Sequence, residues 1–147
     1  MQRTAGPTKY ALTVSLASPI PVIDLFAGPG GLGEGFSALS PTDGEPRFKI
    51  ELSIEKNRWA HQTLELRAFF RRFPSAEAPN EYYLHLRGQL TCEQLFDAYP
   101  EQADAARQEA WCTELGIANT VQVRERISGV LGDAEKWALI GPQNTDY

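Results

Sequence analysis

The feature that most constrains the fold of this chain is a short apolar run that ends in a cluster of glycines. The run Pro21–Phe26 contains β-branched residues, and four of the seven residues in Ala27–Gly33 are glycine. This order predicts a buried strand, a tight turn and then a helix over Leu32–Leu39. Because such a turn points backbone N–H groups at a ligand and its glycines allow close approach, it predicts a nucleotide-binding loop.

A second strand is predicted over Phe48–Ile54, where polar and apolar residues alternate. Glu55 follows it, twenty-two residues beyond Gly33. A carboxylate at the carboxyl edge of a parallel sheet can accept hydrogen bonds from both hydroxyls of a ribose. The pattern Gly28–Gly33 also has the spacing of a dinucleotide-binding loop, so NAD is an alternative ligand on this spacing alone.

The rest of the chain predicts alternating helices and strands. Asn57 can cap a helix that runs to about Phe73, and residues 74–79 break it. The further predictions are a strand over Tyr82–Leu86, a helix capped by Thr91 and running through Ala98, a helix containing Ala103, Ala106, Ala110 and Trp111 and ending at Gly116, a helix containing Val123, Ile127, Val130 and Leu131 and ended by Gly132, and a strand over Trp137–Ile140. Strands that alternate with helices predict an α/β fold with a parallel sheet.

The predicted organisation is an N-terminal arm (1–18) and one domain (19–147) with a helical insertion at about 74–132. A formal net charge of -5 lacks the basic excess of a stand-alone DNA-binding module. The basic cluster Arg67, Arg71 and Arg72 is interpreted as a solvated helix face. Two cysteines without metal-type spacing, and no apolar run of about 18 residues, predict a cytoplasmic protein without a zinc site or membrane span.

The run Asp24–Phe36 closely resembles the first motif of the DNA cytosine-5 methyltransferases. In that family Asp-Leu-Phe-Ala-Gly, a variable residue and Gly-Gly open the S-adenosylmethionine site, whereas dinucleotide folds rarely place Asp-Leu-Phe before the glycines. The resemblance implies a partial Rossmann-like methyltransferase sheet that binds S-adenosylmethionine. The residues that it implies around the methionine part of the cofactor are Phe26, Ala27, Gly28, Gly30, Gly31 and Leu32, and it implies that Glu55 holds the ribose.

Three further positions follow from the resemblance or depart from it. Lys56 stands where many relatives have an aromatic or apolar residue against the adenine. The family also reads the adenine amino group with an Asp after the third strand; Asp133 is a candidate by residue type, although it is better interpreted as a loop residue. Asp24 lies within the first strand and is interpreted as structural, bracing the loop.

The resemblance covers residues 20–72 strongly and 136–141 weakly. The strand that ends at Gly141 resembles the one that leads into Gly-Pro-Pro-Cys, but Pro142–Tyr147 follow instead. Cys92 and Cys112 fall in predicted helices and are not interpreted as the nucleophile. We therefore expect a cofactor-binding part of a restriction-modification type enzyme that is inactive alone, contacts DNA only within a complete enzyme, and associates with a complementing C-terminal chain or with itself. A non-catalytic binding module and an NAD-binding fragment are the alternatives.

Overall fold

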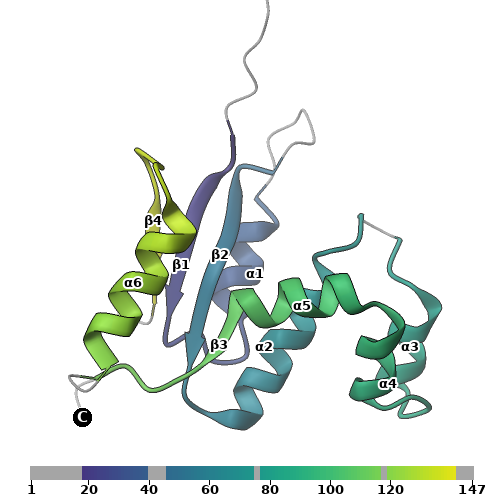
Figure 1. Cartoon of the computed structure of the whole chain (residues 1–147). Coiled ribbons are helices and arrows are strands. Elements are labelled where there is room, and N and C mark those ends of the chain that lie inside the picture. The colour runs from purple at the N-terminus through teal and green to yellow at the C-terminus, as the bar shows by residue number, and fades with distance from the viewer. Residues whose placement is uncertain (1–17, 40–45, 75–76, 117–118, 142–147) are drawn as a thin grey trace, which may run out of the picture.

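The computed structural model describes residues 18–39, 46–74, 77–116 and 119–141, and it has an α/β fold with a parallel sheet (Figure 1). Residues 1–17 of the predicted N-terminal arm and residues 142–147 lie outside the described residues. The strands are β1 (Ile20–Leu25), β2 (Phe48–Glu55), β3 (Ala110–Cys112) and β4 (Ala138–Ile140). The helices are α1 (Gly31–Ser37), α2 (Arg58–Phe70), α3 (Asn80–Leu86), α4 (Cys92–Ala98), α5 (Pro100–Glu109) and α6 (Thr120–Leu131).

The strands lie in the order β3-β2-β1-β4, and every neighbouring pair is parallel. β1 therefore occupies the centre, where Ile23 is in register with Leu52 of β2 and with Leu139 of β4. The chain winds outward from β1 to β3 and then returns to place β4 on the other side of β1. In open α/β sheets this change of direction marks the place where ligands bind, outside the carboxyl ends of the strands. The topology confirms the predicted partial Rossmann-like fold.

Helices cover both faces of the sheet. On one face α6 packs on the buried side chains Ile23, Leu52 and Ile54 (Figure 1). On the other face α1 and α2 pack on the sheet, and α2 continues into a second apolar cluster with α4 and α5. Phe69 of α2 is fully buried there, with its ring 4.9 Å from the ring of Phe96. Together these clusters fix α2 between the sheet and the α3–α5 helices.

The prediction of a strand over Tyr82–Leu86 is wrong, because these residues belong to α3. The Tyr82 ring lies 4.9 Å from the ring of Phe70 in α2, so the aromatic side chains pack on a helix and join no sheet. The predicted helix that is capped by Thr91 and runs through Ala98 is confirmed as α4. Thr91 caps α4, its hydroxyl accepts the Gln94 N–H, and the Gln94 side chain accepts the Thr91 N–H in a capping box.

The helix predicted to end at Gly116 ends earlier. α5 stops at Glu109, and Ala110–Cys112 form β3 beside β2, with Ala110 in register with Ser53. The Trp111 ring packs on the α6 face, where the guanidinium of Arg126 lies 4.6 Å from the ring centroid. Pairing with β2 and this packing on α6 outweigh the helical pattern of the preceding alanines. Cys112 consequently lies on a strand, which corrects its predicted place in a helix.

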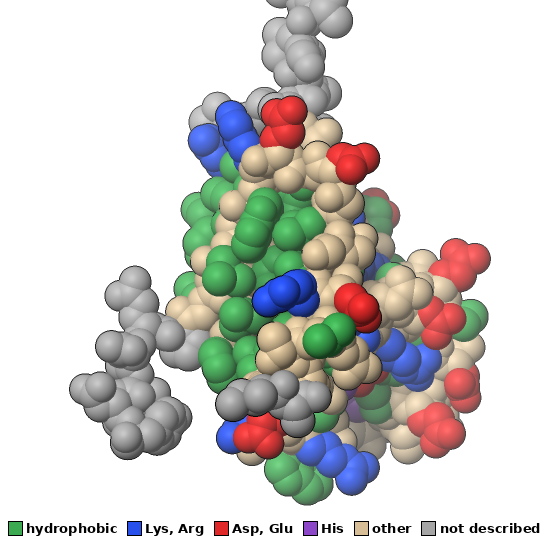
Figure 2. Space-filling model, turned by 60° about the vertical axis from the view of Figure 1, so that its left-hand side comes forward, with side chains coloured by type: hydrophobic (Ala, Val, Ile, Leu, Met, Phe, Trp, Pro, Cys, Tyr) green, Lys and Arg blue, Asp and Glu red, His purple; other side chains and the backbone are tan. Residues whose placement is uncertain are grey.

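The side of the molecule formed by α6 and β4 is strongly apolar, and Figure 2 shows these side chains gathered there. Trp137 and Leu139 are 45% and 56% exposed, and β4 has a strand neighbour on one side only among the described residues. Within the same part of the chain, no helix has the length and apolar character needed to cross a membrane.

Candidate functional site

The glycine turn lies where predicted, between the carboxyl end of β1 and the start of α1. Gly28 and Gly30 adopt the left-handed φ angles of 57° and 90° that favour glycine. At Gly30 space is limited as well, because a Cβ atom there would lie 2.9 Å from Cδ1 of the buried Leu64. The turn is therefore a shaped backbone cradle that packs directly against α2.

Phe26 is the strained residue of this turn. Its φ angle is 56°, which a bulky L-residue rarely adopts. Its side chain is nevertheless 57% exposed, so burial of the ring does not compensate for the strained backbone. Strain of this kind persists where the surrounding structure enforces it, and it is concentrated at ligand-binding sites. Ala27, by contrast, is buried against Leu64 and Ala110, and this packing anchors the turn to α2 and β3.

Glu55 joins the two halves of the predicted site. Its Oε2 accepts a hydrogen bond from the Gly28 N–H at 2.8 Å, and its Oε1 accepts one from the Asn57 N–H at 2.7 Å. Asn57 in turn caps α2, because its side-chain oxygen accepts the N–H groups of Trp59 and Ala60. The carboxylate thus fixes the glycine turn relative to the start of α2. Each carboxylate oxygen retains a second lone pair that can accept a hydrogen bond from a hydroxyl group.

Lys56 extends from the end of β2 toward the loop after β3. Its Nζ lies 3.2 Å from Oε1 of Glu114, and both side chains are largely exposed. Beside this ion pair is a hollow of about 40 Å³, which has room for about one water molecule. Lys56 and Glu114 both line this hollow, and because exposed ion pairs hold together only weakly, the pair can separate to admit a larger group. The hollow is lined by Phe26, Ile54, Lys56, Thr113, Glu114 and Leu115.

Glu114 is a candidate ligand-binding residue that the sequence did not indicate. The predicted helix through Gly116 hid β3, and only the pairing of β3 with β2 places Thr113 and Glu114 after the third strand. Asp133 lies in the turn between α6 and β4. Because β4 is parallel to β1, this turn is at the amino ends of the strands, whereas the glycine turn is at their carboxyl ends. Among the remaining predicted residues, Gly31 opens α1, and Leu32 is 46% exposed beside it.

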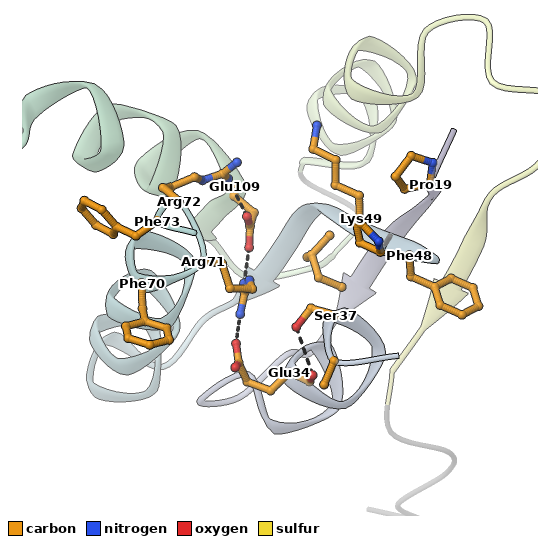
Figure 3. A pocket seen from close by; sticks show the side chains of 13 residues that line it. Pro19, Glu34, Ser37, Phe48, Lys49, Phe70, Arg71, Arg72, Phe73 and Glu109 are labelled. Atoms are coloured by element: carbon orange, nitrogen blue, oxygen red, sulfur yellow. Dashed lines mark hydrogen bonds and ion pairs between the residues drawn. The ribbon is translucent and has the colours of Figure 1, made fainter. Parts of the chain in front are cut away.

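A partly buried polar cluster lies beside α1, the helix that follows the glycine turn. Arg71, the residue that caps the C-terminal end of α2, forms ion pairs with Glu34 of α1 and Glu109 of α5, and Arg72 also pairs with Glu109 (Figure 3). The Arg71 side chain is only 16% exposed. The interpretation of Arg71 and Arg72 as a solvated helix face is therefore wrong, because α1 and α5 cover them. The cluster borders a hollow of about 490 Å³ over the first half of β2.

The two cysteines differ in position. Cys92 is exposed at the start of α4, where desolvation and the nearby Glu65 carboxylate raise the pKa of its thiol. That direction is opposite to the activation of a nucleophilic thiolate. Cys112 lies at the carboxyl end of β3, with its Sγ 4.0 Å from the Lys56 carbonyl oxygen.

Comparison with known proteins relates the chain to methyltransferases. It is 32% identical over 102 residues to the type II methyltransferase M.Bpa9945I of Bacillus paralicheniformis, an alignment that covers 65% of this chain and 21% of the relative. The chain thus spans about a fifth of the length of the curated relative that it matches. No family model matches the chain, and no solved structure matches it.

Proposed function

We propose that this chain supplies the S-adenosylmethionine site of a DNA cytosine-5 methyltransferase. The observation that carries the proposal is the hydrogen bond of 2.8 Å between the Gly28 N–H and Glu55. It brings the glycine turn after β1 and the acid after β2 together at the carboxyl edge of the sheet. The relationship to a type II methyltransferase and the Asp24–Phe36 motif favour this cofactor over NAD.

The residues present fit such a cofactor. A Cβ at Gly28 or Gly31 would meet nothing within 4 Å, so the backbone is open at these two positions, and Phe26 and Leu32 expose apolar surface beside them. We assign the methionine part to this turn, the ribose to Glu55, and the adenine to the hollow beside Lys56. The aliphatic stem of Lys56 would cover the adenine ring, and the Glu114 carboxylate would accept a hydrogen bond from the adenine amino group. When bound, S-adenosylmethionine supplies the methyl group, and these residues bind and orient it.

Binding can be measured by calorimetric titration of the chain with S-adenosylmethionine and, separately, with NAD. We expect S-adenosylmethionine to bind and NAD to give no heat of binding. Glu55→Gln weakens an acceptor of charge-assisted hydrogen bonds, each worth about 1.5–3 kcal/mol, and should lower the affinity about ten- to hundredfold. The matched control Glu125→Gln changes an exposed carboxylate on α6 and should leave the affinity unchanged. Binding of NAD alone would support the dinucleotide alternative and contradict the proposal.

The proposal includes a complementing polypeptide on the β4 side of the sheet. The exposed Trp137 and Leu139, and an edge of β4 that is free among the described residues, suit a further parallel strand. The matched relative is about five times as long as its aligned part, so a methyltransferase has further chain that can supply such a strand. DNA would then be bound by the complete enzyme.

Sedimentation velocity of the chain, alone and with a polypeptide carrying the later methyltransferase motifs, tests this part. A one-to-one complex that Leu139→Lys abolishes is the expected result, because the lysine would place a charge at the exposed edge. A homodimer that excludes the second polypeptide, or no association, would contradict it.

A further inference from the structure

Asp24 is a buried carboxyl group without a hydrogen-bond partner. It lies in β1, two residues before Phe26, and is only 1% exposed. Neither of its oxygens has a hydrogen-bond partner among the described residues, and the same holds for the hydroxyl of Ser53, its register partner on β2. Buried polar groups are nearly always paired, and an unpaired one calls for a physical explanation.

The charges around Asp24 are already balanced without it. Glu34 comes from α1, Arg71 and Arg72 from the turn that follows α2, and Glu109 from α5, and these four groups pair with one another. The positions in register with Asp24 on its two neighbouring strands, Ser53 and Ile140, carry no charge. An ionised Asp24 would therefore be a buried negative charge beside Arg71, which already pairs with two carboxylates.

Desolvation also disfavours the ionised form of Asp24. Burial raises the pKa of Asp24 from 3.8 to about 6, and the attraction of Arg71 offsets only part of this rise. Below about pH 6 the carboxyl group is consequently uncharged. Above that pH the structure must accommodate a buried carboxylate or change to relieve it.

The carboxyl group is in contact with the helix that carries the glycine turn. A Cβ atom on Gly33, in the first turn of α1, would lie 3.3 Å from the Asp24 Oδ2. The next residue, Glu34, is held by Arg71. Because Asp24 is only 1% exposed, hydration of its carboxylate requires a movement of the surrounding structure, and the first turn of α1 lies beside its Oδ2. Such a movement displaces Gly30–Gly33, which form the proposed cofactor cradle.

We propose that Asp24 is a positioning residue: its uncharged carboxyl group seats α1 on β1, and its ionisation displaces the glycine turn and weakens cofactor binding. The identity of the ligand rests on the proposed function, whereas the coupling between Asp24 and α1 does not. The proposal makes the proposed cofactor site sensitive to pH across the weakly acidic to neutral range.

The test is a titration of the full chain with S-adenosylmethionine at about pH 5 and about pH 7.5. Wild-type affinity should fall by about fivefold or more between these values, a usual size for coupling between two sites. Asp24→Asn, which cannot ionise, should remove this fall. Asp24→Val provides a second uncharged variant in case the amide folds poorly.

Two controls separate Asp24 from other titrating groups. Asp97→Asn changes an exposed carboxylate on α4 and should keep the wild-type pH dependence. The second control is His61 of α2, whose imidazole contacts the Ala110 carbonyl oxygen at 3.1 Å. His61→Gln should also keep the wild-type pH dependence of the affinity. A wild-type affinity that does not change with pH, or a pH dependence that survives in Asp24→Asn, would overturn the proposal.

A ligand-free measurement distinguishes failure of this inference from failure of the proposed function. The backbone amide resonances of Gly31–Ser37 should shift with a midpoint near pH 6 in the wild type and should not shift in Asp24→Asn. If these resonances titrate but no S-adenosylmethionine binds at any pH, the ligand assignment is wrong and the coupling stands. If they do not titrate, the coupling is wrong whatever the ligand.

Discussion

Replacing Gly30 by alanine tests whether the glycine turn is as tightly constrained as its geometry indicates. Gly30 has a φ angle of 90° and a ψ angle of 19°, a conformation that costs an L-residue about 1–2 kcal/mol. The new Cβ would lie 2.9 Å from Leu64 Cδ1, and Leu64 is 1% exposed, so its side chain cannot move into solvent. Overpacking of this kind costs about 1–3 kcal/mol. Gly30→Ala should therefore lower the free energy of unfolding by about 2–5 kcal/mol.

Gly35→Ala is the matched control. Gly35 lies inside α1, is exposed, has no positive φ, and a Cβ there would meet nothing within 4 Å. Alanine should stabilise this helix by about 0.5–1 kcal/mol. Urea unfolding followed by tryptophan fluorescence and circular dichroism measures both variants. Unfolding midpoints of Gly30→Ala and Gly35→Ala that coincide would refute the interpretation of the turn as a strained, closely packed cradle.

Three further predictions concern the buried acids and a helix cap. Glu109→Gln should destabilise the chain by about 3 kcal/mol in urea unfolding, because two arginines lose their shared buried partner; the exposed Glu101→Gln should have little effect. Thr91→Ala should cost about 1 kcal/mol in the same assay through loss of the capping box, and an unchanged stability would contradict the importance of that box. Asp24 has a higher pKa in the folded chain than its ordinary value of 3.8, so the folded state binds the proton more tightly and stability falls as the pH rises from about 4 to above 6. At neutral pH Asp24→Asn should thus be more stable than the wild type by up to about 3 kcal/mol, with the difference vanishing below about pH 4 in urea unfolding measured across pH.

Local chemistry explains which elements could be predicted from the sequence. Asn57 and Thr91 are helix caps whose side chains bond to N–H groups two or three residues away, so a few neighbouring residues determine them. The glycine turn is equally local, because the left-handed angles at Gly28 and Gly30 require the glycines that the sequence provides. The caps and the turn led to the predicted placement of α1, α2 and α4, and the apolar patterns of residues 21–26 and 48–54 led to that of β1 and β2.

The elements that were predicted wrongly depend on contacts between distant residues. Ala110–Cys112 form a strand only because β2 lies beside them, and their sequence continues the alanine pattern of α5. Arg71 is buried by Glu34 and by Glu109, which is 38 residues away in the chain. Glu114 became a candidate for the site only when the pairing of β3 was known. None of these contacts leaves a pattern within a single helix or strand.

The central claim is that the edge formed by the glycine turn and Glu55 binds S-adenosylmethionine. The most direct measurement is a titration of the isotope-labelled chain with S-adenosylmethionine, followed through its backbone amide resonances. We predict saturable shifts at Gly28–Gly33 and at Glu55–Asn57, with smaller or no shifts around Arg71. Shifts confined to the hollow beside Arg71, or no shifts at any concentration, would contradict it.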